Sequence, residues 1–354
     1  MKITQIRAVQ PVSPGAPNDW RDWLGQILVI IDTDEELTGY GVGGGGLAGV
    51  HVIETVIRDI LVGQEPNDVE SLWEEMYGRT LPYGQKGLAI MAISGADLAL
   101  WDLRAKVAQQ PLARLLSKDV QETVPVYRTG RPVEEWLKNG TEGYSMLKLF
   151  LGLEPGERVI SKESIDRIVT EVRAVRSALG PDVKIMGDAF MGLDVENTLR
   201  LADELSDVGL VWIEEPLLPD DIEGYARLRD ECPIPIAGGE HEYTAKAFDL
   251  IMKEQLLSVV QPDVCWCGGM TELLKIYRAG ATYGIDVCPH RGSEIWSLHA
   301  ICAVDQKPLA ESGRPWMTWV GGQPPIVKGA IALGEEIGFG VHFDSDTLNV
   351  VNRI

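Results

Sequence analysis

The stretch "VWIEEP", residues 211–216, ends an apolar run with two adjacent glutamates, Glu214 and Glu215. A similar apolar run ends at Asp188 ("VKIMGD", 183–188) and another at Glu240 ("IPIAGGE", 234–240). The acids at 188, 214 and 240 are 26 residues apart each time, which is about the length of one strand and one helix. The spacing therefore predicts three successive strands, each with a carboxylate at its end.

The same alternation of short apolar strands and amphipathic helical stretches extends from about residue 121 to 325. The expected strands are residues 124–129, 146–151, 183–188, 210–215, 234–240, 258–263, 285–290 and 308–311. Eight strands separated by helices predict an α/β fold, and specifically a (β/α)8 TIM barrel.

The two ends of the chain lack this alternation. Residues 1–120 begin with three strand-like runs ("MKITQIRAVQP", "GQILVIIDTD", "LTGYGVG") and continue with helical periodicity, which predicts an N-terminal α+β domain. Residues 121–325 are expected to form the barrel domain, and the tail, 326–354, is expected to return to the first domain.

Composition narrows the classes of partner. The formal charge of −21 over 354 residues repels nucleic acids and anionic membranes, so neither is expected as a partner. This acidity fits a salt-adapted surface or an ordinary cytoplasmic one. Five scattered cysteines favour a reducing compartment, and no apolar run has the length of a transmembrane helix, so a cytoplasmic location is expected.

Strand ends are where a TIM barrel places its chemistry. The side chains expected there are those of Lys148, Asp188, Glu214, Glu240, Asp263, His290 and Glu311. Any one acid could cap a helix or pair with an arginine, but three carboxylates brought together would repel one another. A hard cation such as Mg²⁺, which prefers oxygen ligands, removes that repulsion. Because neighbours in a strand face opposite sides, Glu215 is expected to contact Lys148 or another donor instead.

A second pair of residues suits proton transfer. Asp263 and His290 end consecutive strands, and a carboxylate beside an imidazole fixes its tautomer and raises its basicity. His241 follows Glu240 directly and is a minor candidate for a supporting contact, while His51, His299 and His342 are expected to be structural.

Two further stretches resemble binding motifs: one is rich in glycine and the other contains two cysteines. "GVGGGG" (41–46) satisfies the dinucleotide-binding pattern, but no parallel βαβ unit surrounds it, so we expect a flap over the barrel mouth. "CWC" (265–267) has no second Cys or His pair at zinc-site distance, so it is not expected to bind metal.

The segments "GDAF", "WIEEP", "GGEHE", "QPDVCWCGGMTELLKI" and "VCPH", in this order, resemble the mandelate racemase-like subgroup of the enolase superfamily. Within it the chain looks most like the acid-sugar dehydratases of the L-rhamnonate type. The resemblance implies an N-terminal α+β capping domain and a modified (β/α)7β barrel. It also implies that Asp188, Glu214 and Glu240 bind Mg²⁺ and that the Asp263/His290 dyad removes the proton next to the substrate carboxylate.

Departures from the family pattern shape the remaining expectations. Racemases of the family carry two lysines on the second barrel strand, whereas here "LKLFL" keeps Lys148 and has Phe150 in the second place. A two-base racemase is therefore disfavoured, and Lys148 is expected to polarise the substrate carboxylate. Glu311 is expected either to donate a hydrogen bond when protonated or to pair with Arg314. The expected substrate contacts are Arg21, Arg291 (glycine in the relatives), Trp296 and His241.

These observations favour a Mg²⁺-dependent dehydratase of a sugar acid, for example an aldonate such as L-rhamnonate, that forms a 2-keto-3-deoxy acid. Two alternatives stay open: a racemase or epimerase of a 2-hydroxy acid or amino-acid derivative, and a non-catalytic metal-binding regulator. The tryptophans of "RPWMTWVGG" (314–322) suggest a homo-oligomer interface.

Overall fold

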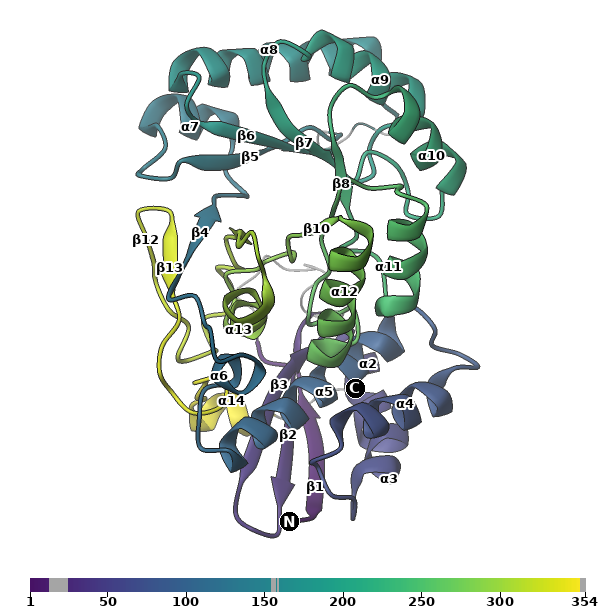
Figure 1. Cartoon of the computed structure of the whole chain (residues 1–354), viewed down its shortest axis with the longest axis vertical. Coiled ribbons are helices and arrows are strands. Elements are labelled where there is room, and N and C mark those ends of the chain that lie inside the picture. The colour runs from purple at the N-terminus through teal and green to yellow at the C-terminus, as the bar shows by residue number, and fades with distance from the viewer. Residues whose placement is uncertain (13–24, 154–156, 158, 351–354) are drawn as a thin grey trace.

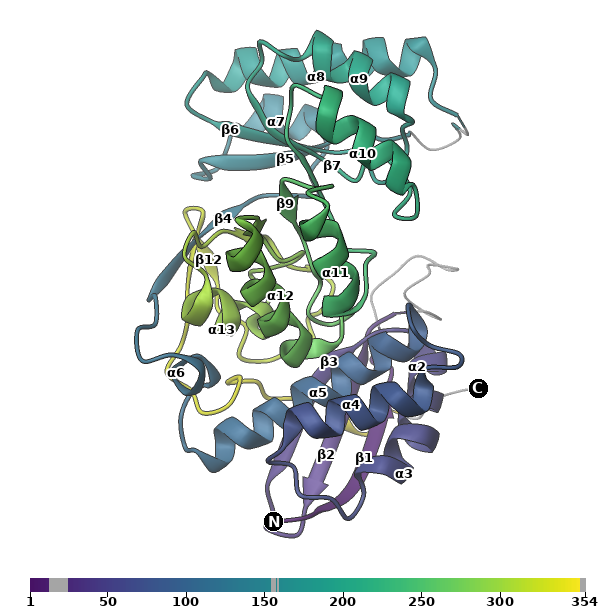
Figure 2. The ribbon, with the colours of Figure 1, turned by 45° about the vertical axis from the view of Figure 1, so that its right-hand side comes forward.

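The computed structural model describes residues 1–12, 25–153, 157 and 159–350. The N-terminal part begins with an antiparallel sheet of order β1-β2-β3, formed by β1 (Ile3–Val9), β2 (Ile27–Thr33) and β3 (Thr38–Gly43). The helices that follow are α2 (Gly46–Val52), the π-helix η1 (Ile53–Ile57), α3 (Arg58–Leu61), α4 (Val69–Thr80), α5 (Leu88–Val107) and α6 (Leu112–Leu116). Figures 1 and 2 show α2 to α5 with this sheet at one end of the molecule, whereas α6 lies beside the barrel.

Glycines in β3 allow this sheet to lie directly on helix α5. A Cβ at Gly41 would come within 2.1 Å of the Gly95 carbonyl oxygen, and one at Gly43 within 2.4 Å of the Met91 oxygen. The expectation of a glycine flap is thus wrong for residues 41–43, because they form a strand packed against a helix. Gly44 lies where a Cβ would meet Trp266 Nε1 at 3.0 Å, so the end of this strand does reach the barrel.

The barrel contains all eight expected strands. They are β4 (Thr123–Tyr127), β5 (Met146–Phe150), β6 (Lys184–Asp188), β7 (Leu210–Glu214), β8 (Ile236–Gly238), β9 (Val259–Val260), β10 (Asp286–Val287) and β11 (Ala310–Glu311). The helices between them are α7 (Val133–Asn139), α8 (Lys162–Leu179), α9 (Val195–Glu204), α10 (Ile222–Glu231), α11 (Thr244–Lys253), α12 (Gly269–Tyr283) and α13 (Ile295–Val304). Within the described residues no helix follows β11 before the next strand, so the (β/α)7β arrangement is confirmed.

Parallel pairing runs from β5 to β10 in sequence order, and β4 pairs in parallel with β11. A parallel bridge between Arg128 and Leu147 joins β4 to β5. Between β10 and β11 the described residues form no regular ladder, and the link there is a hydrogen bond from Ser293 N to Glu311 O of 2.9 Å. The strand ends therefore converge on one mouth.

The barrel interior beneath that mouth is filled with side chains. This buried cluster consists of Tyr127, Met146, Met186, Trp212, Ala237 and Cys288. The floor of the site is therefore a packed core and not a channel, as expected for a barrel of eight strands.

The C-terminal segment contacts both parts of the chain. Strands β12 (Ile326–Val327) and β13 (Ala330–Ala332) form a hairpin, and β13 pairs antiparallel with β4. Beyond it, Phe339 N donates to Asp102 Oδ1 on α5 at 3.0 Å, and Arg7 Nη1 donates to the Leu348 carbonyl of α14 (Ser345–Leu348) at 2.8 Å. The division at residues 120 and 325 stays a prediction. No described helix is long and apolar enough to cross a membrane.

Candidate active site

The barrel mouth gathers the charged side chains expected at the strand ends. Asp188 and Glu214 end β6 and β7 and are register partners, so their side chains start side by side. Glu240 follows β8, Asp263 follows β9, and His290 follows β10. All of these except the half-buried Asp188 are buried. Buried charges need opposite charges or hydrogen bonds close by, and the arrangement below supplies them.

Lys148 lies at the centre of the acidic group. Its Nζ is 3.1 Å from Asp188 Oδ2 and 2.9 Å from Glu311 Oε1, and it donates to Glu214 Oε1. Only 3% of the residue is exposed. Burial alone would lower the lysine pKa, but the charges of Asp188 and Glu214 raise it well above its usual value. Lys148 therefore stays protonated and links three carboxylates.

One lysine does not neutralise this group. Glu214 Oε2 also accepts hydrogen bonds from Gln261 Nε2 at 2.7 Å and Trp212 Nε1 at 3.2 Å. Burial nevertheless raises the Glu214 pKa to about 8; Lys148 opposes this rise, and the nearby Asp188 and other carboxylates add to it. Without a metal the Glu214 carboxyl is therefore largely protonated at pH 7, and a bound cation would favour its ionised form.

The Asp263/His290 dyad has the expected geometry. His290 Nδ1 lies 2.9 Å from Asp263 Oδ2, and its Nε2 lies 3.0 Å from Glu240 Oε2. Burial would lower the imidazole pKa, but the charge of Glu240 and the hydrogen bond to Asp263 raise it to about 10. One ring nitrogen therefore faces the dyad carboxylate and the other faces the acidic group.

Glu215 and His241 form a separate pair. Glu215 has a left-handed backbone (φ 39°), and its Oε2 lies 2.7 Å from His241 Nδ1, while Lys148 contacts Glu214 instead. His241 is thus the donor that Glu215 required. Glu215, Glu240 and His241 also form the one group in the described residues whose possible metal-ligand atoms all lie within 4.8 Å of one another.

Glu311 differs from both expectations. The expected ion pair with Arg314 is wrong, because among the described residues Glu311 contacts Lys148 and accepts from Arg291 N at 2.9 Å. Burial raises the Glu311 pKa, but Lys148 and Arg291 outweigh this and lower it to about 2. The carboxylate is therefore ionised, and the expected role as a protonated donor does not fit this arrangement.

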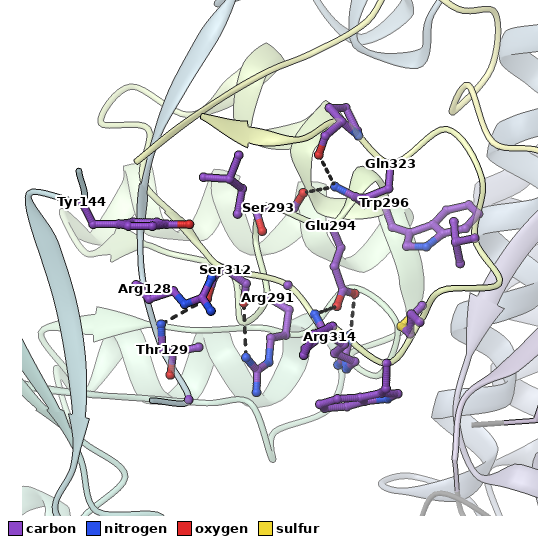
Figure 3. Close-up of a pocket in the computed structure, with 18 residues that line it drawn as sticks. Arg128, Thr129, Tyr144, Arg291, Ser293, Glu294, Trp296, Ser312, Arg314 and Gln323 are labelled. Atoms are coloured by element: carbon purple, nitrogen blue, oxygen red, sulfur yellow. Dashed lines mark hydrogen bonds and ion pairs between the residues drawn. The ribbon is translucent and has the colours of Figure 1, made fainter. Parts of the chain in front are cut away.

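Arg291 separates two cavities at the mouth. One, of ≈ 510 Å³, is lined by Lys148, Asp188 and the half-exposed Phe150. The other, of ≈ 480 Å³, is drawn in Figure 3 and is lined by Arg128, Tyr144, Trp296, Arg314 and Trp316, among others. Arg291 lines both, and its backbone is left-handed (φ 54°).

The other expected substrate contacts have different positions. Trp296 lies on α13 with its ring 4.8 Å from that of Phe339, and although buried it lines the cavity of Figure 3. Arg21 lies outside the described residues.

Sequence reasoning missed Gln261 and misassigned Arg314. Gln261 precedes Asp263 by two positions, so strand alternation, which puts both on one side, was the available signal. No pattern in the sequence pairs Arg314 with Asp263, since 51 positions separate them.

The chain matches two family descriptions. Residues 24–117 match "Mandelate racemase / muconate lactonizing enzyme, N-terminal domain", and residues 132–347 match "Enolase C-terminal domain-like". The chain is 36% identical over 337 residues to L-rhamnonate dehydratase of Saccharopolyspora erythraea, covering 91% of this chain and 84% of that protein.

Two solved structures extend the comparison. Rhamnonate dehydratase from Gibberella zeae complexed with Mg has a TM-score of 0.87 at 29% identity and covers 98% of this chain and 95% of its own. The 3,6-anhydro-D-galactonate cycloisomerase from Zobellia galactanivorans has a TM-score of 0.86 at 29% identity, with 98% of each chain covered.

Proposed function

Because the chain belongs to the mandelate racemase / muconate lactonizing enzyme family of the enolase superfamily, we propose that it is a Mg²⁺-dependent dehydratase of a sugar acid. The observation that carries this proposal is the Asp263/His290 dyad directed at a carboxylate-rich mouth whose central cation is Lys148. The dehydratase names of the relatives support the reaction class.

Asp188, Glu214 and Glu240 would hold the Mg²⁺. Their oxygens are the ligand type that Mg²⁺ prefers, and a bound cation would oppose the rise in the Glu214 pKa that burial and the neighbouring carboxylates cause. When bound there, Mg²⁺ supplies positive charge that stabilises the substrate carboxylate as it gains electron density on loss of the α proton.

His290 would move the proton. Asp263 accepts from Nδ1–H, which leaves Nε2 as the nitrogen that faces the mouth. The high His290 pKa depends on the Glu240 charge 3.0 Å from Nε2, so neutralising Glu240 lowers it toward the range of a working base.

In the proposed reaction Nε2 takes the proton from C2 of the sugar acid. The C3–O bond then breaks, and the leaving hydroxyl departs as water with that proton. The remaining enol tautomerises to a 2-keto-3-deoxy acid.

Lys148 would direct its charge at the substrate carboxylate, since its position among Asp188, Glu214 and Glu311 lies beside the larger cavity. Two residues after Lys148 the strand carries Phe150, whose exposed fraction is 47%. Strand β5 therefore has no second lysine that could act as a base on the opposite side of the substrate. This favours the dehydratase over the racemase alternative.

The test is a screen of aldonic and aldaric acids with Mg²⁺, L-rhamnonate first, that reads 2-keto acid formation by semicarbazide absorbance. The His290→Asn variant should lose the product, while His51→Asn, outside the site, should keep it. Exchange of the α proton in heavy water with no keto acid would favour the racemase or epimerase. Mg²⁺ binding with neither reaction would favour the non-catalytic regulator.

A further inference from the structure

We propose that Arg314 is a positioning residue for the Asp263/His290 dyad and that Glu294 holds Arg314 in place. The activity test of this inference rests on the proposed function, whereas its spectroscopic test does not. Figure 3 shows Arg314 and Glu294 joined beside the ≈ 480 Å³ cavity, which both of them line.

The Asp263 carboxylate is held by donors from three places in the fold. Its Oδ1 accepts from the backbone N–H of Cys265 at 2.8 Å. Its Oδ2 accepts from His290 Nδ1 at 2.9 Å and also from Arg314 Nη2. Because Arg314 follows β11 and His290 follows β10, the arginine ties three successive strand ends together at one oxygen.

Arg314 is itself fixed by a second carboxylate. Its Nη1 lies 2.5 Å from Glu294 Oε2, and its backbone N donates to Glu294 Oε1 at 2.8 Å. The Arg314 side chain is 2% exposed, and the Trp266 ring centre lies 5.5 Å from its Cζ. A buried guanidinium with two carboxylate partners and an aromatic face is confined to one geometry.

The positioning role of Arg314 follows because Arg314 and His290 both bind the same oxygen of Asp263. Asp263 Oδ2 can direct His290 only while the carboxylate plane is fixed, and Arg314 holds this oxygen while the Cys265 N–H holds Oδ1. Lysine cannot reproduce this, because its ammonium is a point charge without the planar fork that spans Asp263 and Glu294. A small misplacement of the base costs about 10²-fold in rate.

The activity test compares Arg314→Ala, Arg314→Lys and Glu294→Gln with Arg173→Ala, a control whose ion pair with Asp207 is exposed. On the substrate found by the keto acid screen, Arg314→Ala should lower kcat about 100-fold with KM changed less than about threefold. Added guanidinium ion should restore part of the rate of this variant and leave Arg173→Ala unchanged. A kcat within threefold of wild type, or a loss confined to KM, would overturn the proposal.

A second measurement needs neither substrate nor activity. Proton NMR of the full chain should show the His290 Nδ1–H of the Asp263 hydrogen bond far downfield, identified by its absence in His290→Asn. In Arg314→Lys and Glu294→Gln, which keep a similar volume, this resonance should shift or broaden, with thermal unfolding confirming the fold. An unchanged resonance in both variants would overturn the proposal, even if no sugar acid proves to be a substrate.

Discussion

Replacing His299 by asparagine tests the charge state of a buried histidine outside the active site. His299 is 1% exposed on α13; its Nδ1 accepts from Ala113 N at 3.0 Å, and its Nε2 donates to the Phe339 carbonyl at 3.3 Å. Burial lowers its pKa from 6.5 to about 4. The imidazole is therefore neutral in the folded protein at pH 7, and protonation would remove the acceptor that holds α6.

The sign and size of the pH effect follow from these two pKa values. Above pH 6.5 both the folded and the unfolded His299 are neutral, so the contribution to stability is complete. As the pH falls from 6.5 to 4 only the unfolded chain gains the proton, and the free energy of unfolding falls by about 1.4 kcal/mol per pH unit. The total loss is about 3 kcal/mol.

Asparagine should keep the bond to Ala113 through Oδ1 and lose the bond to Phe339. At pH 7 this costs about 1 kcal/mol, as expected for one hydrogen bond. Asparagine does not titrate, so urea unfolding curves should show wild type as more stable at pH 7 and the variant as more stable near pH 4.5.

Carboxylates elsewhere affect both proteins alike, and His342→Asn, which removes an exposed histidine, should show no such crossover. A constant difference between wild type and His299→Asn from pH 7 to 4.5 would refute the reasoning.

Three further predictions concern the mouth. His290→Asn should lower keto acid formation by about 10³-fold, because it removes the proton-transfer group; a fall under tenfold in stopped assays would assign the base elsewhere. Asp188→Asn should weaken Mn²⁺ binding, read by EPR, more than about tenfold, whereas Glu215→Gln should have a smaller effect; the reverse order would favour the Glu215, Glu240 and His241 group as the metal site. Arg291→Gly should be more stable than Arg291→Ala by about 1 kcal/mol in urea, because φ is 54° there, yet both should raise KM for the sugar acid; equal stability would contradict the argument from the backbone.

The positions of the strands could be predicted because hydrophobic runs and helical periodicity are local properties. Each expected barrel strand overlaps an observed one, although β9, β10 and β11 are only two residues long. Their ends, and with them Asp263 and His290, were predictable because parallel strands present their C-terminal residues at one edge.

Contacts between distant residues could not be predicted in this way. Three such contacts depend on which side chains from distant strand ends meet at the mouth. They are the ion pairs of Lys148, the contact of Arg314 with Asp263, and the contact of Glu215 with His241. The left-handed backbone of Glu215 is a further case, since no glycine marks the turn.

The expected oligomer interface illustrates the same limit. Trp316 lines the cavity of Figure 3, Trp319 lies near Phe343 with tilted rings whose centres are 6.2 Å apart, and both tryptophans are half-buried. A homo-oligomer stays a prediction.

The charges of the mouth connect the separate inferences. Five strand-end carboxylates meet there, and among the described residues the cations in contact with them are Lys148, Arg314 and, when protonated, His290 and His241. For His290 to act as a base it must give up its proton, which deepens the negative surplus at the moment when an anionic substrate enters. A cation held by the proposed ligands Asp188, Glu214 and Glu240 would offset that surplus, while Arg314, which cannot be deprotonated at ordinary pH, keeps Asp263 ionised and in place. The charges of these residues therefore favour a bound cation at the mouth, in agreement with the relative whose structure is complexed with Mg.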